Sequence, residues 1–253
     1  MKKSLPKGLF PFLYGAAIFL LWSVIAHFVQ AEYLFPSPLS VLRKIWDLRD
    51  ILFGVHLLST AYVTWMGLLL GLTIGFVLAV IMDEFPWGKR LFYPLVVASQ
   101  TIPTTAIAPL FVLWFGYGFT SRILATVLIT FFPIAITLHK GLESTPTEAK
   151  ELLGTYGATR LQTWMYLKFP HALPSLFTAL RMAAPIAVIG AAISEWIGAQ
   201  NGLGYFSRRM ASQLDGAGVF APIVLLSLLA LILVKFLEFA EYLALRRRKH
   251  RRK

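Results

Sequence analysis

The amino-acid sequence predicts an all-α, polytopic membrane protein with about six transmembrane helices in a single domain. Hydrophobic residues make up 57% of the 253 positions and charged residues only 14%, whereas soluble domains contain about 25% charged residues. Mean hydropathy is +0.69. Uncharged runs long enough to cross a hydrocarbon core of about 30 Å recur along the chain and are separated by short polar segments.

The expected spans cover residues 8–31, 56–82, 91–115, 122–139, 175–198 and 219–243. Lys2, Lys3 and Lys7 precede the first of them. A cleaved signal peptide also has a basic head, but its apolar run is usually about 7 to 15 residues, so we expect an uncleaved span. Residues 32–50 follow, with apolar residues at near-helical spacing between charged ones. Such a segment is typical of a helix along the membrane surface.

Three glycines mark the second span. Gly67, Gly71 and Gly75 are four residues apart, and small residues at this spacing let two helices approach closely. In so apolar a helix they could equally reflect general packing. A short polar turn at residues 83–90 leads back to the third span.

The third span is interrupted by prolines and by a polar cluster. The prolines are Pro94, Pro103 and Pro109, and the cluster consists of Ser99, Gln100, Thr101, Thr104 and Thr105. Such residues at membrane depth are tolerated where other helices or an aqueous cavity satisfy the freed backbone groups, so we interpret the cluster as lining a translocation path. The alternative is a kinked structural helix whose hydroxyls bond to their own carbonyls.

Charged residues in the fifth and sixth spans need separate explanations. Glu195 lies near the outer end of the fifth, where it could belong to an external gate or substrate route, or simply lie among the lipid headgroups. Arg181 is near enough to the interface to snorkel and is interpreted as an anchor. Lys235 and Glu238 are three residues apart and could form an ion pair.

The polar insert at residues 141–174 separates the fourth and fifth spans. A short helix is expected after Thr147, with Glu148 near its positive end. Gly154 and Gly157 should break it into a turn. A second amphipathic segment covers residues 159–169, and Pro170 and Pro174 are expected to end it.

At these residues the chain resembles the inner-membrane permease subunits of bacterial ATP-binding-cassette (ABC) importers. Their cytoplasmic signature has a Glu, two small residues, a Gly six positions after the Glu, and a later Pro. Glu148 with Gly154 matches the first residues of this signature. Glu151 with Gly157 and Ala158 also places Pro170 thirteen positions after the glycine, so we prefer that alignment. Leu152 and Leu153 then replace the usual alanines.

The resemblance implies a type I importer permease of MetI-like architecture, in which this loop forms a coupling helix. The implied partners are a cytoplasmic ABC ATPase dimer, an extracytoplasmic substrate-binding protein and a second permease copy in a homodimer. The substrate branches it resembles carry sulfonates, taurine, nitrate or pyrimidine precursors of thiamine. The residues at 100–103 and 184–190 favour the pyrimidine-precursor branch.

Basic residues are distributed unevenly between the loops. With both termini in the cytoplasm, 16 Lys and Arg lie inside and six outside, and Arg181 and Lys235 complete the 24. This bias fits the positive-inside rule for a bacterial inner-membrane protein and puts residues 141–174 in the cytoplasm. The basic tail at 246–253 then lies beside anionic lipid, and no nucleic-acid partner is expected despite the net charge of +12.

The sequence favours no enzymatic activity. It contains no GxxxxGK[ST] phosphate loop, so the chain is expected to bind no cofactor, with ATP and Mg²⁺ held by the partner ATPase. Cysteine is absent, and the five histidines do not form a metal-binding spacing. An ion-driven secondary transporter is the main alternative, although it should have carboxylates at mid-depth and an internal repeat. An intramembrane enzyme would need a paired nucleophile and base.

Overall fold

The computed structural model describes residues 9–250, and all regular structure in that range is helical. The elements are α1 (Leu9–Val29), α2 (Pro38–Asp47), α3 (Arg49–Ile51), η1 (Leu52–Leu57), α4 (Leu58–Glu84), α5 (Pro86–Ser99), α6 (Thr104–Phe115), α7 (Phe119–Glu143), α8 (Thr147–Thr155), α9 (Arg160–Thr163), η2 (Trp164–Lys168), α10 (Phe169–Gly198), α11 (Leu203–Ser212) and α12 (Gly216–His250). The basic residues expected to flank the membrane at positions 2, 3, 7 and 251–253 lie outside the described range. The all-α prediction is confirmed.

Five of the six expected spans each fall on one helical unit, and the third falls on two. Four units are long and apolar enough to cross a membrane: Arg49–Glu84, Phe119–Glu143, Arg160–Gly198 and Gly216–Arg246. The third span is a pair of helices, α5 and α6, bent by 96° at the break between them. The apolar part of α1 is shorter, Leu13–Val29. The second span begins at Arg49, seven residues before its predicted start at position 56.

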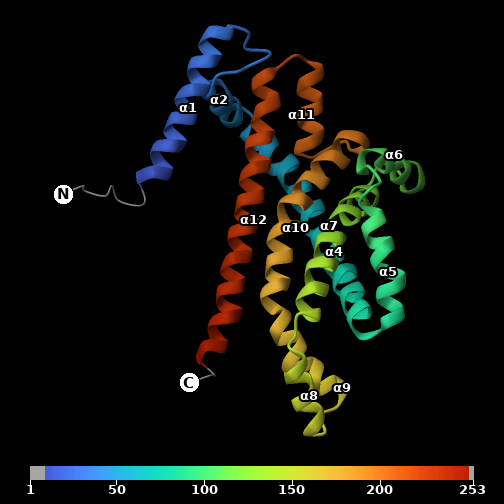
Figure 1. Cartoon of the computed structure of the whole chain (residues 1–253). Coiled ribbons are helices and arrows are strands. Elements are labelled where there is room, and N and C mark those ends of the chain that lie inside the picture. The colour runs from blue at the N-terminus through green and yellow to red at the C-terminus, as the bar shows by residue number, and fades with distance from the viewer. Residues whose placement is uncertain (1–8, 251–253) are drawn as a thin grey trace, which may run out of the picture.

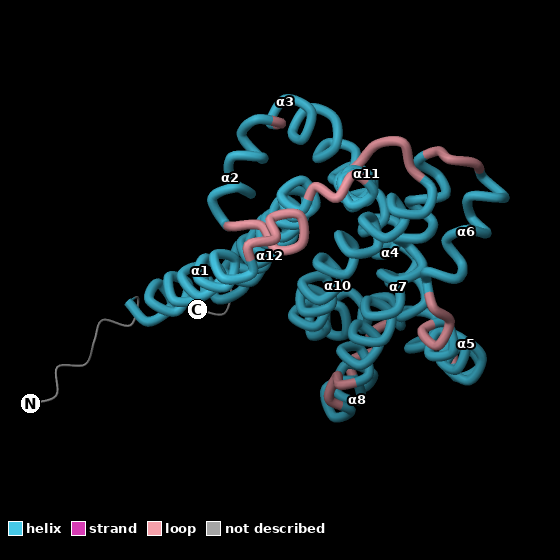
Figure 2. The backbone as a smooth tube through the Cα atoms, turned by 90° about the horizontal axis from the view of Figure 1, so that it is seen from above, coloured by secondary structure: helices cyan, strands magenta, loops and turns pink. Residues whose placement is uncertain are grey.

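The helices form an elongated bundle. α4, α7, α10 and α12 run lengthwise beside one another, and α5 lies along one side (Figure 1). α8 and α9 project at one end of the bundle, and α2, α6 and α11 lie towards the other (Figure 1). We call these the α8 end and the α11 end. Seen from above, α1 extends away from the bundle (Figure 2).

The glycine stripe on α4 packs directly against α7. All three glycines are buried, and a Cβ on any of them would overlap an atom of α7. The opposing residues are Thr126 for Gly67, Thr130 for Gly71, and Phe131 and Ile134 for Gly75. The spacing on α7 therefore repeats the four-residue spacing on α4. The stripe is a helix-packing face, as the spacing predicts.

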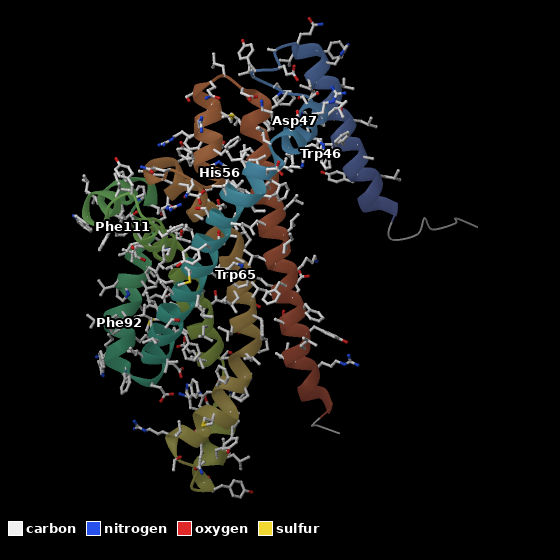
Figure 3. The ribbon with its side chains drawn as sticks, turned by 180° about the vertical axis from the view of Figure 1, so that it is seen from behind. Trp46, Asp47, His56, Trp65, Phe92 and Phe111 are labelled. Carbon is white, nitrogen blue, oxygen red and sulfur yellow. The ribbon has the colours of Figure 1, made fainter. Side chains whose placement is uncertain are left out.

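Small and aliphatic side chains fill the core between α4, α7, α10 and α12. The cluster contains Leu68, Ile134, Ala179, Leu180, Ala183, Ala184, Ala187, Val188, Leu233 and Leu237. At its edge, Trp65 of α4 meets Phe236 of α12 edge to face, with ring centroids 5.7 Å apart, and Trp65 lies about midway along the bundle (Figure 3). Alanine-rich helix faces permit close packing in the absence of large side chains.

Ion pairs join α12 to itself and to α10. Lys235 Nζ lies 2.7 Å from Glu238 Oε2, so the predicted pair is confirmed. Arg181 Nη1 lies 2.5 Å from Glu241 Oε2. Arg181 therefore does more than anchor its own helix at the interface, because it links α10 to α12.

The prediction that Pro170 and Pro174 end the second amphipathic segment is wrong. α9, η2 and α10 form one continuous unit, Arg160–Gly198, with Pro170 in the first turn of α10 and Pro174 inside it. Five residues of π-helix directly precede Phe169 and Pro170. A proline ring clashes with the carbonyl four residues earlier in a regular α-helix, and a widened turn moves that carbonyl away. The π-helical turn includes Tyr166, four residues before Pro170, and so lets the helix pass Pro170; Pro174 lies farther along, inside α10.

Candidate coupling loop and translocation path

The insert forms a compact helical elbow at the α8 end. It is shorter than the predicted range of 141–174, because α7 continues to Glu143 and α10 begins at Phe169. α8 starts after Pro146, which occupies the N-cap position expected for Thr147. Glu148 and Glu151 are exposed. The elbow thus presents a helix to the surroundings of the bundle.

Gly157 makes the turn of the elbow. Its φ of +74° lies in the left-handed region, which is unfavourable for residues that have a Cβ atom. The Ala158 amide donates to the Leu153 carbonyl at 3.0 Å and so closes the end of α8. Gly154 is instead an ordinary residue of α8 with open space around it. The alignment on Glu151 and Gly157 therefore places its glycine where the backbone needs one.

A capping box starts the second half of the elbow. The Thr159 hydroxyl accepts from the Gln162 amide at 3.3 Å, and the Gln162 side chain accepts from the Thr159 amide at 2.7 Å. These bonds satisfy two otherwise free amides at the helix start. The amphipathic segment predicted from position 159 therefore begins at Thr159.

Lys168 connects the elbow to the end of α4. Its Nζ lies 2.9 Å from Asp83 Oδ2 and 2.6 Å from Glu84 Oε1. The Lys168 side chain is 15% exposed and that of Asp83 is 7% exposed. A second pair, Lys89 with Glu143 at 2.5 Å, joins α5 to α7 at the same end. The sequence did not predict these contacts, since nothing in the spacing brings position 168 to positions 83 and 84.

We expect Lys168→Met to loosen the elbow. The change leaves two partly buried carboxylates without their cation, and removing one partner of such a cluster should cost about 2–4 kcal/mol. The measurement is the melting temperature of the purified protein in detergent, together with protease cleavage in the elbow. Lys140→Met is the matched control, because Lys140 is exposed at the same end and has no ion-pair partner among the described residues. Equal melting temperatures for the two variants would contradict the role of Lys168.

The polar cluster of the third span lies at the break between α5 and α6. Ser99 ends α5, Gln100 and Thr101 lie in the break, and Thr104 and Thr105 begin α6. The Ser99 hydroxyl donates to the Val96 carbonyl at 2.7 Å and the Thr101 hydroxyl to the Ala98 carbonyl at 2.8 Å. Both bonds are those expected of a kinked structural helix, in which the hydroxyls bond to carbonyls of their own helix. The 96° bend and the exposure of Gln100, Thr101 and Thr105 still leave polar groups on the surface of a broken helix.

Glu195 lies elsewhere, at the α11 end. Its side chain is 0% exposed. Oε2 accepts hydrogen bonds from the Thr60 hydroxyl and from the Gly204 amide, each at 2.9 Å. The structure therefore places Glu195 inside the bundle, and it brings Glu195 together with neither the elbow nor the α5–α6 break. Among the described residues, no group of His, Asp and Glu could hold a metal ion.

Residues 71–249 match the family described as "Binding-protein-dependent transport system inner membrane component". The chain is 47% identical over 232 residues to the formylaminopyrimidine transport permease protein ThiX of Halalkalibacterium halodurans, covering 92% of each chain. It is 34% identical to the riboflavin transport system permease protein RibX of Chloroflexus aurantiacus, covering 85% of this chain and 80% of the relative.

The fold also resembles a solved transporter. A chain of the MetNI methionine ABC transporter in an inward-facing conformation superposes with a TM-score of 0.58 at 23% sequence identity, covering 83% of this chain and 97% of that one. At this identity the likeness supports the fold alone, and it confirms the expected MetI-like architecture. The family match and the 47% identical relative show that this chain belongs to the binding-protein-dependent transport inner-membrane family, the multi-pass permeases of ABC importers.

Proposed function

We propose that this permease imports a pyrimidine precursor of thiamine, of the formylaminopyrimidine class. The observation that carries the proposal is the 47% identity to a formylaminopyrimidine permease over 92% of both chains. The relative named for riboflavin transport is 34% identical. Alkanesulfonate, taurine and nitrate remain the alternative solutes for the same machinery.

The proposed partners follow from the elbow and from the family. An ATPase dimer would grip α8 on the cytoplasmic side, because the elbow projects beyond the bundle (Figure 1) and its Glu148, Glu151 and Tyr156 are exposed. A binding protein would deliver the solute at the α11 end. A second copy would complete the pore, and the exposed polar groups of the α5–α6 break would face the path. Both termini would then be cytoplasmic, in line with 16 basic residues inside and six outside.

The elbow is suited to carry motion. Lys168 ties it to α4, and the unbroken helix from Arg160 to Gly198 ties it to α10. Movement of α8 after ATP hydrolysis would therefore shift α4 and α10 together. A rigid-body displacement of this kind moves a path between inward-open and outward-open states.

Transport by reconstituted vesicles tests the proposal. The chain would be inserted into proteoliposomes with its ATPase inside the vesicles and the binding protein outside. Labelled formylaminopyrimidine should accumulate only when ATP is enclosed. Accumulation of taurine or an alkanesulfonate in its place would refute the substrate, and accumulation driven by an ion gradient without ATP would refute the ABC mechanism.

A further inference from the structure

Two charged side chains are buried at the α11 end, and the transport mechanism above assigns neither a role. Glu195 of α10 is 0% exposed and Arg122 of α7 is 3% exposed. Burying a charge in an apolar bundle is costly unless hydrogen bonds compensate it. The hydrogen-bond partners of Glu195 and Arg122 therefore indicate which part of the structure the two charges stabilise.

Glu195 and Thr60 cap α11 from other helices. The N-cap residue of α11 is Gly202, which has no side chain to accept a hydrogen bond from the first turn. The Leu203 amide donates to the Thr60 hydroxyl at 2.8 Å, and the Gly204 amide donates to Glu195 Oε2 at 2.9 Å. A carboxylate is favourable here because the first amides of a helix carry partial positive charge.

Arg122 binds Asn201, the residue directly before the N-cap of α11. Its Nη1 donates to the Asn201 carbonyl at 3.3 Å and to the Ser59 hydroxyl at 3.1 Å, and its Nε donates to the Gly118 carbonyl at 3.2 Å. The guanidinium also lies 4.3 Å from the centre of the Phe119 ring. Arg122 thus connects α7 to α4 and to the segment that enters α11.

His56 binds Gly202, the N-cap residue of α11. Its Nδ1 accepts from the Gly202 amide at 3.0 Å, and it lies where η1 meets the α11 end of the bundle (Figure 3). Gly202 has a φ of +115°, and a Cβ there would overlap the Glu195 carboxylate. Glycine at 202 therefore lets the carboxylate approach the backbone.

Every residue from 201 to 204 is thus bound through its backbone by a side chain of another element. We propose that Glu195 and Arg122 are positioning residues of an α11 latch, defined as Arg122, Glu195, His56 and Thr60 with residues 201–204. The latch fixes α11 to α4, α7 and α10, so that these helices move as one body.

Thiol labelling tests the latch, since the chain has no cysteine of its own. Ser207 of α11 is 3% exposed, so Ser207→Cys should react slowly with a charged maleimide in the purified protein. Adding Glu195→Ala removes the acceptor of a charge-assisted bond to α11, and labelling should become at least about tenfold faster, which corresponds to about 1.4 kcal/mol. Glu195→Gln keeps an acceptor oxygen and should restore slow labelling.

Two controls separate the latch from general loss of stability. Ser194→Ala alters the neighbouring buried residue, whose hydroxyl donates to the Ala191 carbonyl within α10 at 2.8 Å, and should leave labelling unchanged. Ala179→Cys places the thiol in the core of α10 and should stay unreactive in the Glu195→Ala protein. If Glu195→Ala does not yield folded protein, Thr60→Val, which replaces the hydroxyl by a methyl group of similar size, is used in its place, with the same expected direction.

The proposal is overturned if Glu195→Ala labels no faster than Ser194→Ala. It is also overturned if Ala179→Cys becomes equally reactive, or if Glu195→Gln reacts as fast as Glu195→Ala. The assay needs neither ATPase nor solute, so it stands or falls separately from the proposed function.

Discussion

Gly157→Val is expected to abolish ATP-driven transport while leaving the bundle folded. The backbone at Gly157 has a φ of +74°, and a β-branched residue held there should cost about 1–3 kcal/mol. An added Cβ would meet no atom within 4 Å, so the strain lies in the backbone, and moving α8 relieves it at the expense of the bond from the Ala158 amide to the Leu153 carbonyl. We expect ATPase retention and solute uptake to fall by at least about tenfold, the equivalent of about 1.4 kcal/mol of lost interaction.

Gly154→Ala is the matched comparison. Gly154 lies inside α8 and a Cβ there would meet no atom within 4 Å. Alanine is favoured over glycine in a helix by about 1 kcal/mol, so this variant should keep ATPase retention and uptake. Loss of both activities in Gly154→Ala, with normal activity in Gly157→Val, would show that the signature aligns on Glu148 and Gly154 instead.

The sequence predicts the spans because their signal is local. Long uncharged runs and the glycine spacing at 67, 71 and 75 follow directly from what a lipid environment requires of a helix. The elbow is also local, since Thr159 and Gly157 act on residues within a few positions. These features need no knowledge of how distant segments meet.

The contacts that the sequence could not predict join distant positions. Lys168 bonds to residues more than 80 positions away, and Glu195 reaches Thr60 across 135 positions. The spacing of apolar residues shows which face of a helix is buried, but it does not show which other helix that face contacts. A partial signal was present for Arg122, because an arginine so near the start of an apolar span needs partners in the protein. The continuous helix through Pro170 was not predicted, because the π-helical turn before it has no recognisable sequence pattern.

Gly75→Val should destabilise the fold at the α4–α7 interface. A Cβ at Gly75 would lie 2.8 Å from the Phe131 carbonyl oxygen and 2.9 Å from Ile134 Cβ. A backbone oxygen cannot rotate away as a side chain can, so α4 and α7 must separate along the whole stripe. Overpacking of this kind costs about 1–3 kcal/mol, and the loss of contact at Gly67 and Gly71 adds to it.

The measurement is the yield of monodisperse protein in detergent and its melting temperature. Gly54→Val is the control, because Gly54 is exposed on η1 and a Cβ added there would meet no atom within 4 Å. Gly54→Val should purify like the unaltered protein, whereas Gly75→Val should aggregate or melt at a clearly lower temperature. Equal behaviour would mean that the α4–α7 interface yields easily, and the two helices could then slide past each other during transport. A rigid interface instead makes α4 and α7 a single lever, which transmits a displacement at the elbow along the length of the bundle.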